Sequence, residues 1–293
     1  MTEIAVQQSE FLWPSVEARL PDGYAAGLHT VTGSPAGLDY YLYVPRAVRQ
    51  GRVLVAVHGV SRNALEQARL FKKLAEAFGV LLVAPHFPAK AFRDYQRLGR
   101  KGMGPRADLA LIRVLNEIQA GSGCDTSQVD LFGFSGGAQF AHRFAMVHPQ
   151  RVRRLSLGAA GWYTLPDVDH AYPYGAADAK GLDAARLNLH AAARIPTLVL
   201  VGECDDRADY DGLNRSRTVC RTQGRHRLER ARVWVRAMND FASSQGYRAA
   251  VSLQLLPGIG HSFSQAVLQG ALDSHVYTHC YGGRDLPQKP LNR

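Results

Sequence analysis

The chain alternates between apolar, strand-like runs and stretches with helical spacing, and this alternation limits the folds open to it. The apolar runs contain few polar residues, so we expect strands that are buried on both faces. The runs are YYLYVP at 40–45, RVLVAVHGV at 52–60, VLLVAPHF at 80–87, VDLFGF at 129–134, VRRLSLGAAGW at 152–162, PTLVLVGECD at 196–205 and AVSLQLLPG at 250–258. Helical spacing is clear at 64–78 and 106–120. The pattern predicts an α/β fold with a mostly parallel central sheet that helices cover on both faces.

One segment interrupts the alternation. Right-handed crossovers would place the carboxyl ends of the strands along one edge of the sheet, where sites in α/β proteins usually form. The segment from Thr164 to Ile195 is rich in Pro, Tyr, Ala and Asp and has no clear strand. We expect it to be a lid or cap over that edge. With 293 residues and no linker or internal repeat, the chain is expected to form one domain over 1–293, with the lid inside it.

Targeting signals and cysteine usage bear on the compartment. The N-terminal sequence shows no basic stretch followed by an apolar one, and no apolar run is long enough to cross a membrane. The four cysteines form no CxxC pair. We therefore expect reduced thiols in a cytoplasmic protein without a membrane partner, and a disulfide between Cys220 and Cys280 stays open. The sequence does not predict an oligomeric state.

The chain is basic, with a formal net charge of +10. Eight arginines fall between Arg215 and Arg236. A second basic group is formed by Arg93, Arg97, Arg100, Lys101 and Arg106. Such charge can attract an anionic substrate or nucleic acid. Because no nucleic-acid-binding motif accompanies it, we favour a solvated helix face and do not expect a nucleic-acid partner.

The sequence GFSGG at 133–137 separates an apolar run from a helical stretch. It fits the pattern Gly-x-Ser-x-Gly, in which a tight turn from strand to helix raises the serine above the sheet. Gly133 and Gly137 are small where strand and helix would approach closely, and the N–H of Gly136 would face an oxyanion at the start of the helix. The same letters can form a glycine-rich turn with an incidental serine. The position between strand and helix favours Ser135 as a nucleophile.

Serine is a weak nucleophile unless a base and an orienting acid assist it, and the sequence supplies both at strand ends. Asp205 lies three residues beyond Gly202, and His261 follows the last strand in a glycine-flanked loop. The order Ser135, Asp205, His261 is the order of nucleophile, acid and base in α/β-hydrolases. This order, met at three separate strand ends, predicts a catalytic triad.

Other residues compete for the roles of acid and base. Glu203 and Asp206 are neighbouring carboxylates; we favour Asp205 because its offset from Gly202 suits the tip of the loop, and Asp206 stays open. The chain also contains ten other histidines, among them His142, His148, His275 and His279. The first two would be carried away along the helix that follows Ser135, and the last two would lie in a helix beyond the last strand. We treat these histidines as packed or surface residues.

The sequence HGV at 58–60 lies at the end of a strand, before a polar loop. A turn there can point the N–H of Val60 toward a reacting carbonyl, beside the N–H of Gly136. We therefore expect Val60 and Gly136 to form an oxyanion hole. The side chain of His58 is expected to support the turn through hydrogen bonds.

These motifs resemble those of the α/β-hydrolase superfamily, from Tyr40 to His261 and beyond. Within it, YYLYVP and FGFSGGAQFAHRFAMVHPQRV at 132–152 are similar to the poly(3-hydroxybutyrate) depolymerase-like esterases. The resemblance implies a serine hydrolase of esters, including hydroxyalkanoate-type oligomers or polyesters. The absence of a visible secretory signal and of a separate substrate-binding domain argues against digestion of an extracellular polymer. Poly(aspartic acid) hydrolases are similar to the same group, which makes an acidic polyamide a second candidate substrate.

The expected reaction forms an acyl-serine on Ser135, with His261 as the base and Asp205 as the orienting acid. This reaction needs no metal or organic cofactor. The expected partner is a small or oligomeric ester, and the arginine clusters would attract it if it carried negative charge. Two other functions stay open: an amidase or peptidase that uses the same triad, and a binding protein without catalysis on a hydrolase scaffold. The complete set of catalytic residues argues against the second.

Two groups of residues are candidates for substrate contact. Phe134, Trp162 and Tyr163 lie near the expected site and can form an apolar wall, although core packing explains them equally well. The cations Arg97, Arg100 and Lys101 can contact a carboxylated substrate, although a role in solubility is the simpler explanation.

Overall fold

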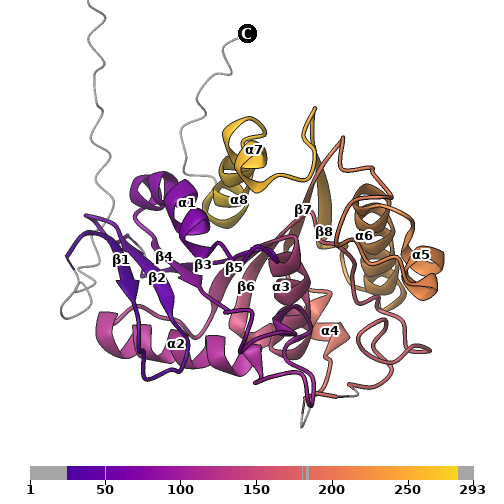
Figure 1. Cartoon of the computed structure of the whole chain (residues 1–293), viewed down its shortest axis with the longest axis horizontal. Helices are drawn as coiled ribbons and strands as arrows, with labels where there is room; N and C mark the ends of the chain where they lie inside the picture. Colours follow the sequence, from indigo (N-terminus) through magenta and orange to yellow (C-terminus); the bar gives the residue numbers. More distant parts are fainter. Residues whose placement is uncertain (1–24, 50, 180, 183–184, 283–293) are drawn as a thin grey trace, which may run out of the picture.

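The computed structural model describes residues 25–49, 51–179, 181–182 and 185–282. Its centre is an eight-stranded sheet with the strand order β1-β2-β4-β3-β5-β6-β7-β8 (Figure 1). Strands β3 to β8 pair in parallel, whereas β1 and β2 form an antiparallel edge. The strands are β1 (Gly27–Val31), β2 (Tyr40–Val44), β3 (Val53–Val57), β4 (Leu81–Pro85), β5 (Val129–Phe134), β6 (Val152–Gly158), β7 (Thr197–Gly202) and β8 (Val251–Leu256).

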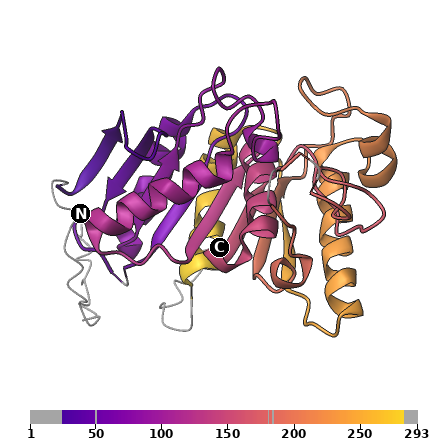
Figure 2. The ribbon, with the colours of Figure 1, turned by 90° about the horizontal axis from the view of Figure 1, so that it is seen from below.

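Helices cover both faces of this sheet, as Figures 1 and 2 show. Helices α1, α7 and α8 share a core with one face, and α2, α3 and α6 share a core with the other. The helices are α1 (Ala64–Phe78), α2 (Ala107–Ser122), α3 (Gly136–Val147), α4 (Leu189–Ala192), α5 (Arg217–Gln223), α6 (Arg227–Ser244), α7 (Phe263–Leu268) and α8 (Leu272–Tyr281), with short 3₁₀ turns η1 (Tyr95–Arg97) and η2 (Pro149–Arg151). The chain therefore has the expected α/β architecture, with a mostly parallel sheet between two helical layers.

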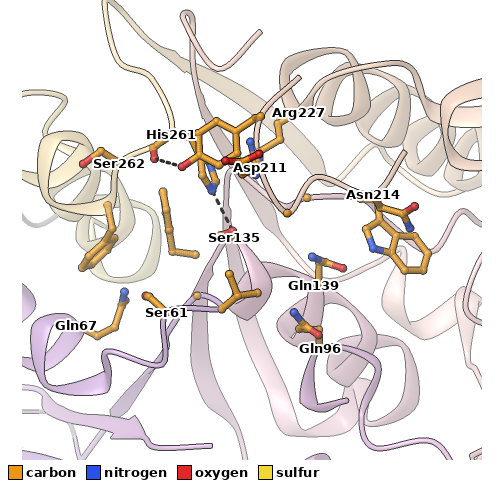
Figure 3. A pocket seen from close by; sticks show the side chains of 18 of the residues that line it. Ser61, Gln67, Gln96, Ser135, Gln139, Asp211, Asn214, Arg227, His261 and Ser262 are labelled. Carbon is orange, nitrogen blue, oxygen red and sulfur yellow. Dashed lines mark hydrogen bonds between the residues drawn. The ribbon is translucent and has the colours of Figure 1, made fainter. Parts of the chain in front are cut away.

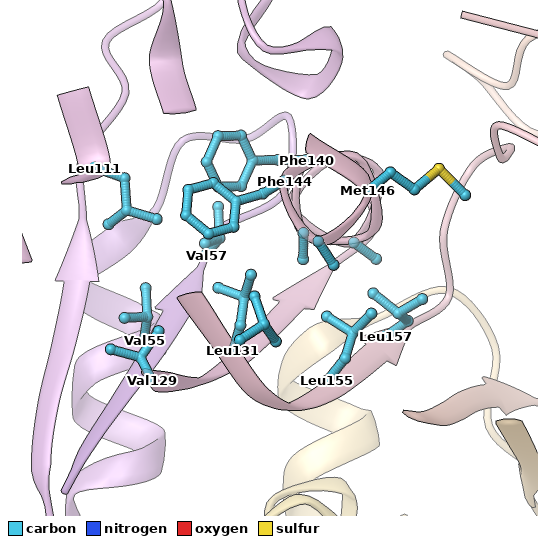
Figure 4. Packing of buried hydrophobic residues seen from close by; sticks show 14 of the residues in the cluster. Val55, Val57, Leu111, Val129, Leu131, Phe140, Phe144, Met146, Leu155 and Leu157 are labelled. Atoms are coloured by element: carbon cyan, nitrogen blue, oxygen red, sulfur yellow. The ribbon is translucent and has the colours of Figure 1, made fainter. Parts of the chain in front are cut away.

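Both faces of the central strands are apolar because both are covered. Val55 and Val57 of β3 belong to the core on the α2–α3 side, and the alternate residues Leu54 and Ala56 belong to the core on the α1–α8 side. Figure 4 shows the first core, in which Phe140 and other side chains of α3 pack above the strands. Burial of each such side chain contributes about 1.5–3 kcal/mol relative to its exposure. The two cores fix the sheet that positions the loops described below.

The described residues of 164–195 form an irregular segment that contains α4 near its end. Thr164 and Tyr172 of this segment are buried against the body of the protein. The Thr164 hydroxyl accepts a hydrogen bond from Arg143 of α3 at 3.0 Å and donates one to the Pro173 carbonyl at 2.7 Å. The segment therefore packs against the flank of α3.

Membrane association and disulfides can be checked within the described residues. None of the helices in these ranges is long and apolar enough to span a bilayer. The four cysteines are free thiols; Cys124 and Cys280 are buried, Cys220 is half-buried and Cys204 is exposed. The Cys220–Cys280 disulfide that the sequence left open is not formed in this structure.

Candidate active site

Ser135 occupies a sharp turn between β5 and α3. Its backbone has φ 54° and ψ −112°, an unusual conformation for a residue with a side chain. The Ser135 N–H donates to the Gly158 carbonyl at 2.7 Å, which anchors the turn to β6. Serine often caps a helix with its hydroxyl, but here the Ser135 side chain makes no capping bond to α3. The hydroxyl is therefore free to point away from the helix and into the site.

The glycines on either side of Ser135 permit this turn. A Cβ atom on Gly133 would clash with the backbone of Gly137, and a Cβ atom on Gly137 would clash with the carbonyl oxygen of Val57. Strand β5, helix α3 and strand β3 thus meet at van der Waals contact of their backbones. Only glycine fits at these two crossings without a shift of the elements.

Ser135, His261 and Asp205 form a continuous hydrogen-bonded chain. His261 Nε2 lies 3.0 Å from Ser135 Oγ (Figure 3). His261 Nδ1 lies 2.7 Å from Asp205 Oδ2. The three residues follow β5, β8 and β7, whose carboxyl ends lie at one edge of the sheet. Because the Asp205 carboxylate accepts the Nδ1–H, Nε2 carries the lone pair that faces the hydroxyl. This geometry suits abstraction of the serine proton.

The rival residues from the sequence lie elsewhere. Glu203 and Asp206 flank Asp205 but are exposed, whereas Asp205 is buried. His142 is buried on α3, where its Nδ1 bonds the Ala138 carbonyl at 2.8 Å and its Nε2 accepts from the Thr164 N–H at 2.9 Å. His148 bonds Asp108 at 2.7 Å, at the far end of α3. The structure thus brings Asp205 and His261, and not these alternatives, to Ser135.

The loop after β3 lies directly against the serine turn. Val57 of β3 pairs with Gly133 of β5, which sets the following residues beside Ser135. A Cβ built on Gly59 would lie 3.4 Å from the Ser135 Cβ, and one built on Gly136 would lie 3.0 Å from a methyl of Val60. Within the described part of the chain, the N–H groups of Val60 and Gly136 donate no hydrogen bond. Two N–H groups without a hydrogen-bond partner among the described residues therefore lie at the turn that carries Ser135.

His58 holds the peptide that carries the Val60 N–H. Its Nε2 accepts from the Phe87 N–H at 3.0 Å, so Nδ1 carries the proton and donates to the Gly59 carbonyl at 2.8 Å. The Gly59 carbonyl and the Val60 N–H belong to one planar peptide and point in opposite directions. Fixing the carbonyl therefore turns the Val60 N–H away from His58. Burial lowers the pKa of His58 to about 4, so the ring is neutral near pH 7.

A cavity of about 500 Å³ opens above Ser135. Figure 3 shows Ser61 and Gln67 on one side of Ser135 and His261, and Gln96, Gln139 and Asn214 on the other. Phe134, Phe263 and Trp162 contribute aromatic surface, while Glu66, Arg97, Asp211 and Arg227 contribute charge. A cavity of this size suits a small molecule or the end of an oligomer. Its walls are mostly polar, with several amide side chains.

The three aromatic candidates from the sequence have different places. Phe134 and Trp162 line the cavity, and the Phe134 ring also stacks on His261 with a centroid distance of 5.4 Å. Trp162 is backed by the guanidinium of Arg143, which lies 4.3 Å from its ring. Tyr163 does not line the cavity; it is fully buried and stacks on Trp234 at 5.0 Å. Core packing, the alternative that the sequence allowed, describes Tyr163.

The next two groups are the expected lid at 164–195 and the cations Arg97, Arg100 and Lys101, which the sequence offered as substrate contacts. None of the described residues in 164–195 lines it; the loop from Asp205 to Asn214 supplies a wall instead, through Tyr210, Asp211 and Asn214. Of the basic loop residues, Arg97 lines the cavity, and both Arg97 and Arg100 pair with the buried carboxylate of Asp94.

Sequence reasoning missed most of the polar cavity wall, because isolated glutamines and asparagines belong to no motif. Gln139 was missed as well, although its position one helical turn after Ser135 is visible in the sequence. Sequence reasoning also missed Arg227, which contacts Asp205. Among the described residues, there is no group of three His, Cys, Asp or Glu side chains placed to hold a metal ion.

Comparisons with known proteins found similarity among solved structures. No family model matches the sequence, and no curated protein matches it. The structure of poly(aspartic acid) hydrolase-1 from Sphingomonas sp. KT-1 is similar, with a TM-score of 0.73 and 23% identity over 88% of this chain and 99% of that one. LpqC, a poly(3-hydroxybutyrate) depolymerase from Bordetella parapertussis, has a TM-score of 0.72 and 29% identity over 90% of this chain and 93% of that one.

A more distant similarity extends to an S-formylglutathione hydrolase from Agrobacterium tumefaciens, with a TM-score of 0.57 and 15% identity over 86% of this chain and 93% of that one. The fold and these similarities define the class: the chain has the α/β-hydrolase fold. Within that class it resembles the poly(3-hydroxybutyrate) depolymerase-like esterase group, as the sequence predicted.

Proposed function

We propose that the protein is a serine hydrolase that cleaves carboxylic esters through an acyl-serine on Ser135. The observation that carries the proposal is the hydrogen-bonded chain from Ser135 Oγ through His261 to Asp205, at a strained turn beside two free N–H groups. The solved structures that resemble this chain are hydrolases and esterases, which supports an enzyme of this class. At 29% identity, the poly(3-hydroxybutyrate) depolymerase supports an ester as the bond that is cleaved.

In the first step, Ser135 Oγ attacks the acyl carbon of the ester while His261 Nε2 takes its proton. The carbonyl oxygen becomes an oxyanion, which accepts hydrogen bonds from the N–H groups of Val60 and Gly136. Each such donor lowers the barrier by about 3 kcal/mol. The carboxylate of Asp205 stabilises the imidazolium of His261. His261 then gives the proton to the leaving oxygen, and the alcohol departs.

In the second step, water releases the acid. His261 takes a proton from a water molecule, whose oxygen attacks the acyl carbon, and the same N–H groups stabilise the second oxyanion. Collapse returns the proton to Ser135 Oγ and frees the carboxylic acid. Phe134 and Trp162 would contact the acyl or alcohol group, because both line the cavity. The amide side chains of Gln96, Gln139 and Asn214 favour a small or polar ester over a long alkyl chain.

An acidic polyamide is the second candidate substrate. Arg97 lines the cavity, and the poly(aspartic acid) hydrolase structure is similar over nearly its whole length. Glu66 and Asp211 line the same cavity and would repel a polyanion. We therefore favour the ester. Turnover of short esters and of poly(aspartic acid), measured side by side at low and high salt, separates the two: a polyanion's turnover would fall as salt rises.

Replacement of the nucleophile tests the proposal. Ser135→Ala removes the attacking oxygen, so hydrolysis of p-nitrophenyl acetate should fall by about three orders of magnitude or more while the fold is kept. The measurement is kcat/KM, with circular dichroism as the check on folding. Ser243→Ala, an exposed position on α6, is the control and should keep full activity. Folded Ser135→Ala protein with more than about a percent of the activity would contradict the assignment.

A further inference from the structure

The acid of the proposed triad has a second partner. Asp205 Oδ2 bonds His261, and Asp205 Oδ1 lies 3.2 Å from Nη1 of Arg227, the first residue of α6. Both side chains are buried, with exposed fractions of 2% for Asp205 and 4% for Arg227. The backbone N–H of Leu228 also donates to the Asp205 carbonyl at 3.3 Å. The start of α6 therefore holds both the side chain and the backbone of Asp205.

Arg227 differs from most of the arginines around it. Of the eight arginines between 215 and 236, six are exposed, as expected for a solvated helix face, and two are buried. The exposed six are Arg215, Arg217, Arg221, Arg225, Arg232 and Arg236. Arg230, the other buried one, donates to the carbonyls of Gly161 and Asn214 at 2.6 and 2.8 Å. The solvated-face interpretation is thus incorrect for Arg227 and Arg230, which are buried, and of these two Arg227 lines the cavity.

Tyr210 links Arg227 to the histidine. The Arg227 guanidinium lies 4.4 Å from the centre of the Tyr210 ring, and the ring meets the His261 ring edge-on at 5.0 Å. A guanidinium placed over an aromatic ring is attracted by the face of the ring, which helps to hold it in position. The Arg227 Nε is buried without a hydrogen-bond partner in the described structure, which is a cost to stability.

We propose that Arg227 is a positioning residue of the triad: it holds the Asp205 carboxylate toward His261. Its positive charge offsets part of the charge of that carboxylate, so the pH profile of hydrolysis depends on it. The proposal rests on the proposed function. It adds a fourth residue to the triad, from a helix whose sequence shows no catalytic motif.

The sign of the effect follows from the charges. The carboxylate of Asp205 favours the protonated form of His261, and a cation beside that carboxylate offsets part of its pull. With a neutral residue in place of Arg227, the full charge of Asp205 would act on His261. The acidic limb of the pH profile of hydrolysis is therefore expected at higher pH in such a variant.

Other ionisable groups lie around Arg227, Asp205 and His261, and they are the same in the unchanged protein and in the Arg227 variants. Tyr210 meets His261 from the loop after β7, and Tyr163, whose pKa is raised by burial and by Asp205, faces the carboxylate from the loop after β6. Glu66 of α1 and Asp211 line the cavity that His261 faces. At the start of α6, the N-cap residue His226 pairs with Glu229 at 3.3 Å, and Arg230 is the buried cation nearest to Arg227 in the sequence.

The test is the pH profile of kcat/KM for p-nitrophenyl acetate in Arg227→Gln, Arg227→Lys and the unchanged protein. In Arg227→Gln the midpoint of the acidic limb should move about one pH unit higher, and the plateau should fall about tenfold or more. In Arg227→Lys, which keeps the charge but loses the forked guanidinium, the midpoint should stay within a few tenths of a pH unit while the plateau falls. Arg232→Gln, an exposed arginine of the same helix, should change neither quantity.

The outcomes are distinguishable. A folded Arg227→Gln protein whose plateau falls while its midpoint stays in place would overturn the role in setting the pH range. A protein with neither quantity changed would overturn the positioning role as well. If Arg227→Gln fails to fold, Arg227→Met, which keeps the apolar stem beneath Tyr210, takes its place in the same assay. Failure of the unchanged protein to hydrolyse any ester would instead contradict the proposed function.

Discussion

At the scale of single residues, the site contains groups in energetically unfavourable conformations or environments. Ser135 has a positive φ, which costs on the order of 1–3 kcal/mol, and the hydrogen bond to Gly158 together with the close backbone contacts of its glycine neighbours holds it there. His58 is a buried imidazole whose two nitrogens are both bonded, and His142 is another. Burial lowers the pKa of His58 to about 4 and that of His142 well below its usual value.

These two histidines predict an acid-sensitive fold. In the unfolded chain the pKa of a histidine is about 6.5, and in the folded chain the pKa values of these two are lower. The stability that they contribute is therefore fully present above pH 6.5. As the pH falls from 6.5 toward 4, the unfolded chain takes up protons that the folded chain does not. Each histidine then lowers the free energy of unfolding by about 1.4 kcal/mol per pH unit. Urea unfolding between pH 7 and pH 4.5 measures the slope.

The share of His58 is measured by substitution. His58→Gln keeps a donor and an acceptor but cannot take up a proton. The slope of the free energy of unfolding against pH should therefore become shallower by about 1.4 kcal/mol per pH unit, the contribution of one proton. An equal slope in the two proteins would show that His58 is not the neutral, buried group described here. Carboxylates also titrate at the lower end of this range, and the comparison of the two slopes removes their contribution.

At the scale of elements, the motif at 133–137 marks the junction of β5 and α3 in the sequence itself. Gly133 and Gly137 flank the serine, which indicates that the strand and helix approach closely. The motif does not indicate that the backbone of β3 also touches α3, since β3 and β5 are far apart in sequence and adjacent only in the sheet. Strand β1 was not predicted because it is a half-buried edge strand with little apolar pattern.

The contact of β3 with α3 predicts a large effect from one methyl group. In Gly137→Ala, the added Cβ would meet the Val57 carbonyl oxygen, so helix and strand must separate. Overpacking of this kind should lower the free energy of unfolding by about 1–3 kcal/mol, measured by urea unfolding, and should displace Ser135 enough to reduce ester hydrolysis.

Gly121→Ala is the matched control. Gly121 lies in α2 with open space around the position of its Cβ, so alanine there should raise stability by about 0.5–1 kcal/mol. If Gly137→Ala proved as stable and as active as the unchanged protein, the close approach of β3 and α3 would not be needed for the site.

At the scale of the whole molecule, the order of the strands turns scattered residues into one site. The sequence predicted the layers, the mostly parallel sheet and the strand ends that carry Ser135, Asp205 and His261, because each of these leaves a local pattern. The cavity wall leaves none: Gln67, Gln96 and Asn214 come from three separate loops and helices and meet only in the folded chain. The packing of residues 164–195 could not be predicted either, because contacts between distant segments leave no local pattern. The composition of this stretch indicated irregular structure but not what it packs against.

The central claim is that Ser135 is the group that becomes acylated. The direct measurement is treatment of the folded protein with a fluorophosphonate, followed by mass spectrometry of its peptides. We expect one phosphonate per chain, on Ser135, and no labelling of Ser135→Ala. Reaction at Ser135 requires the whole arrangement, because an isolated serine does not react with such reagents at neutral pH. An unlabelled chain, or a phosphonate located on another residue, would contradict the account.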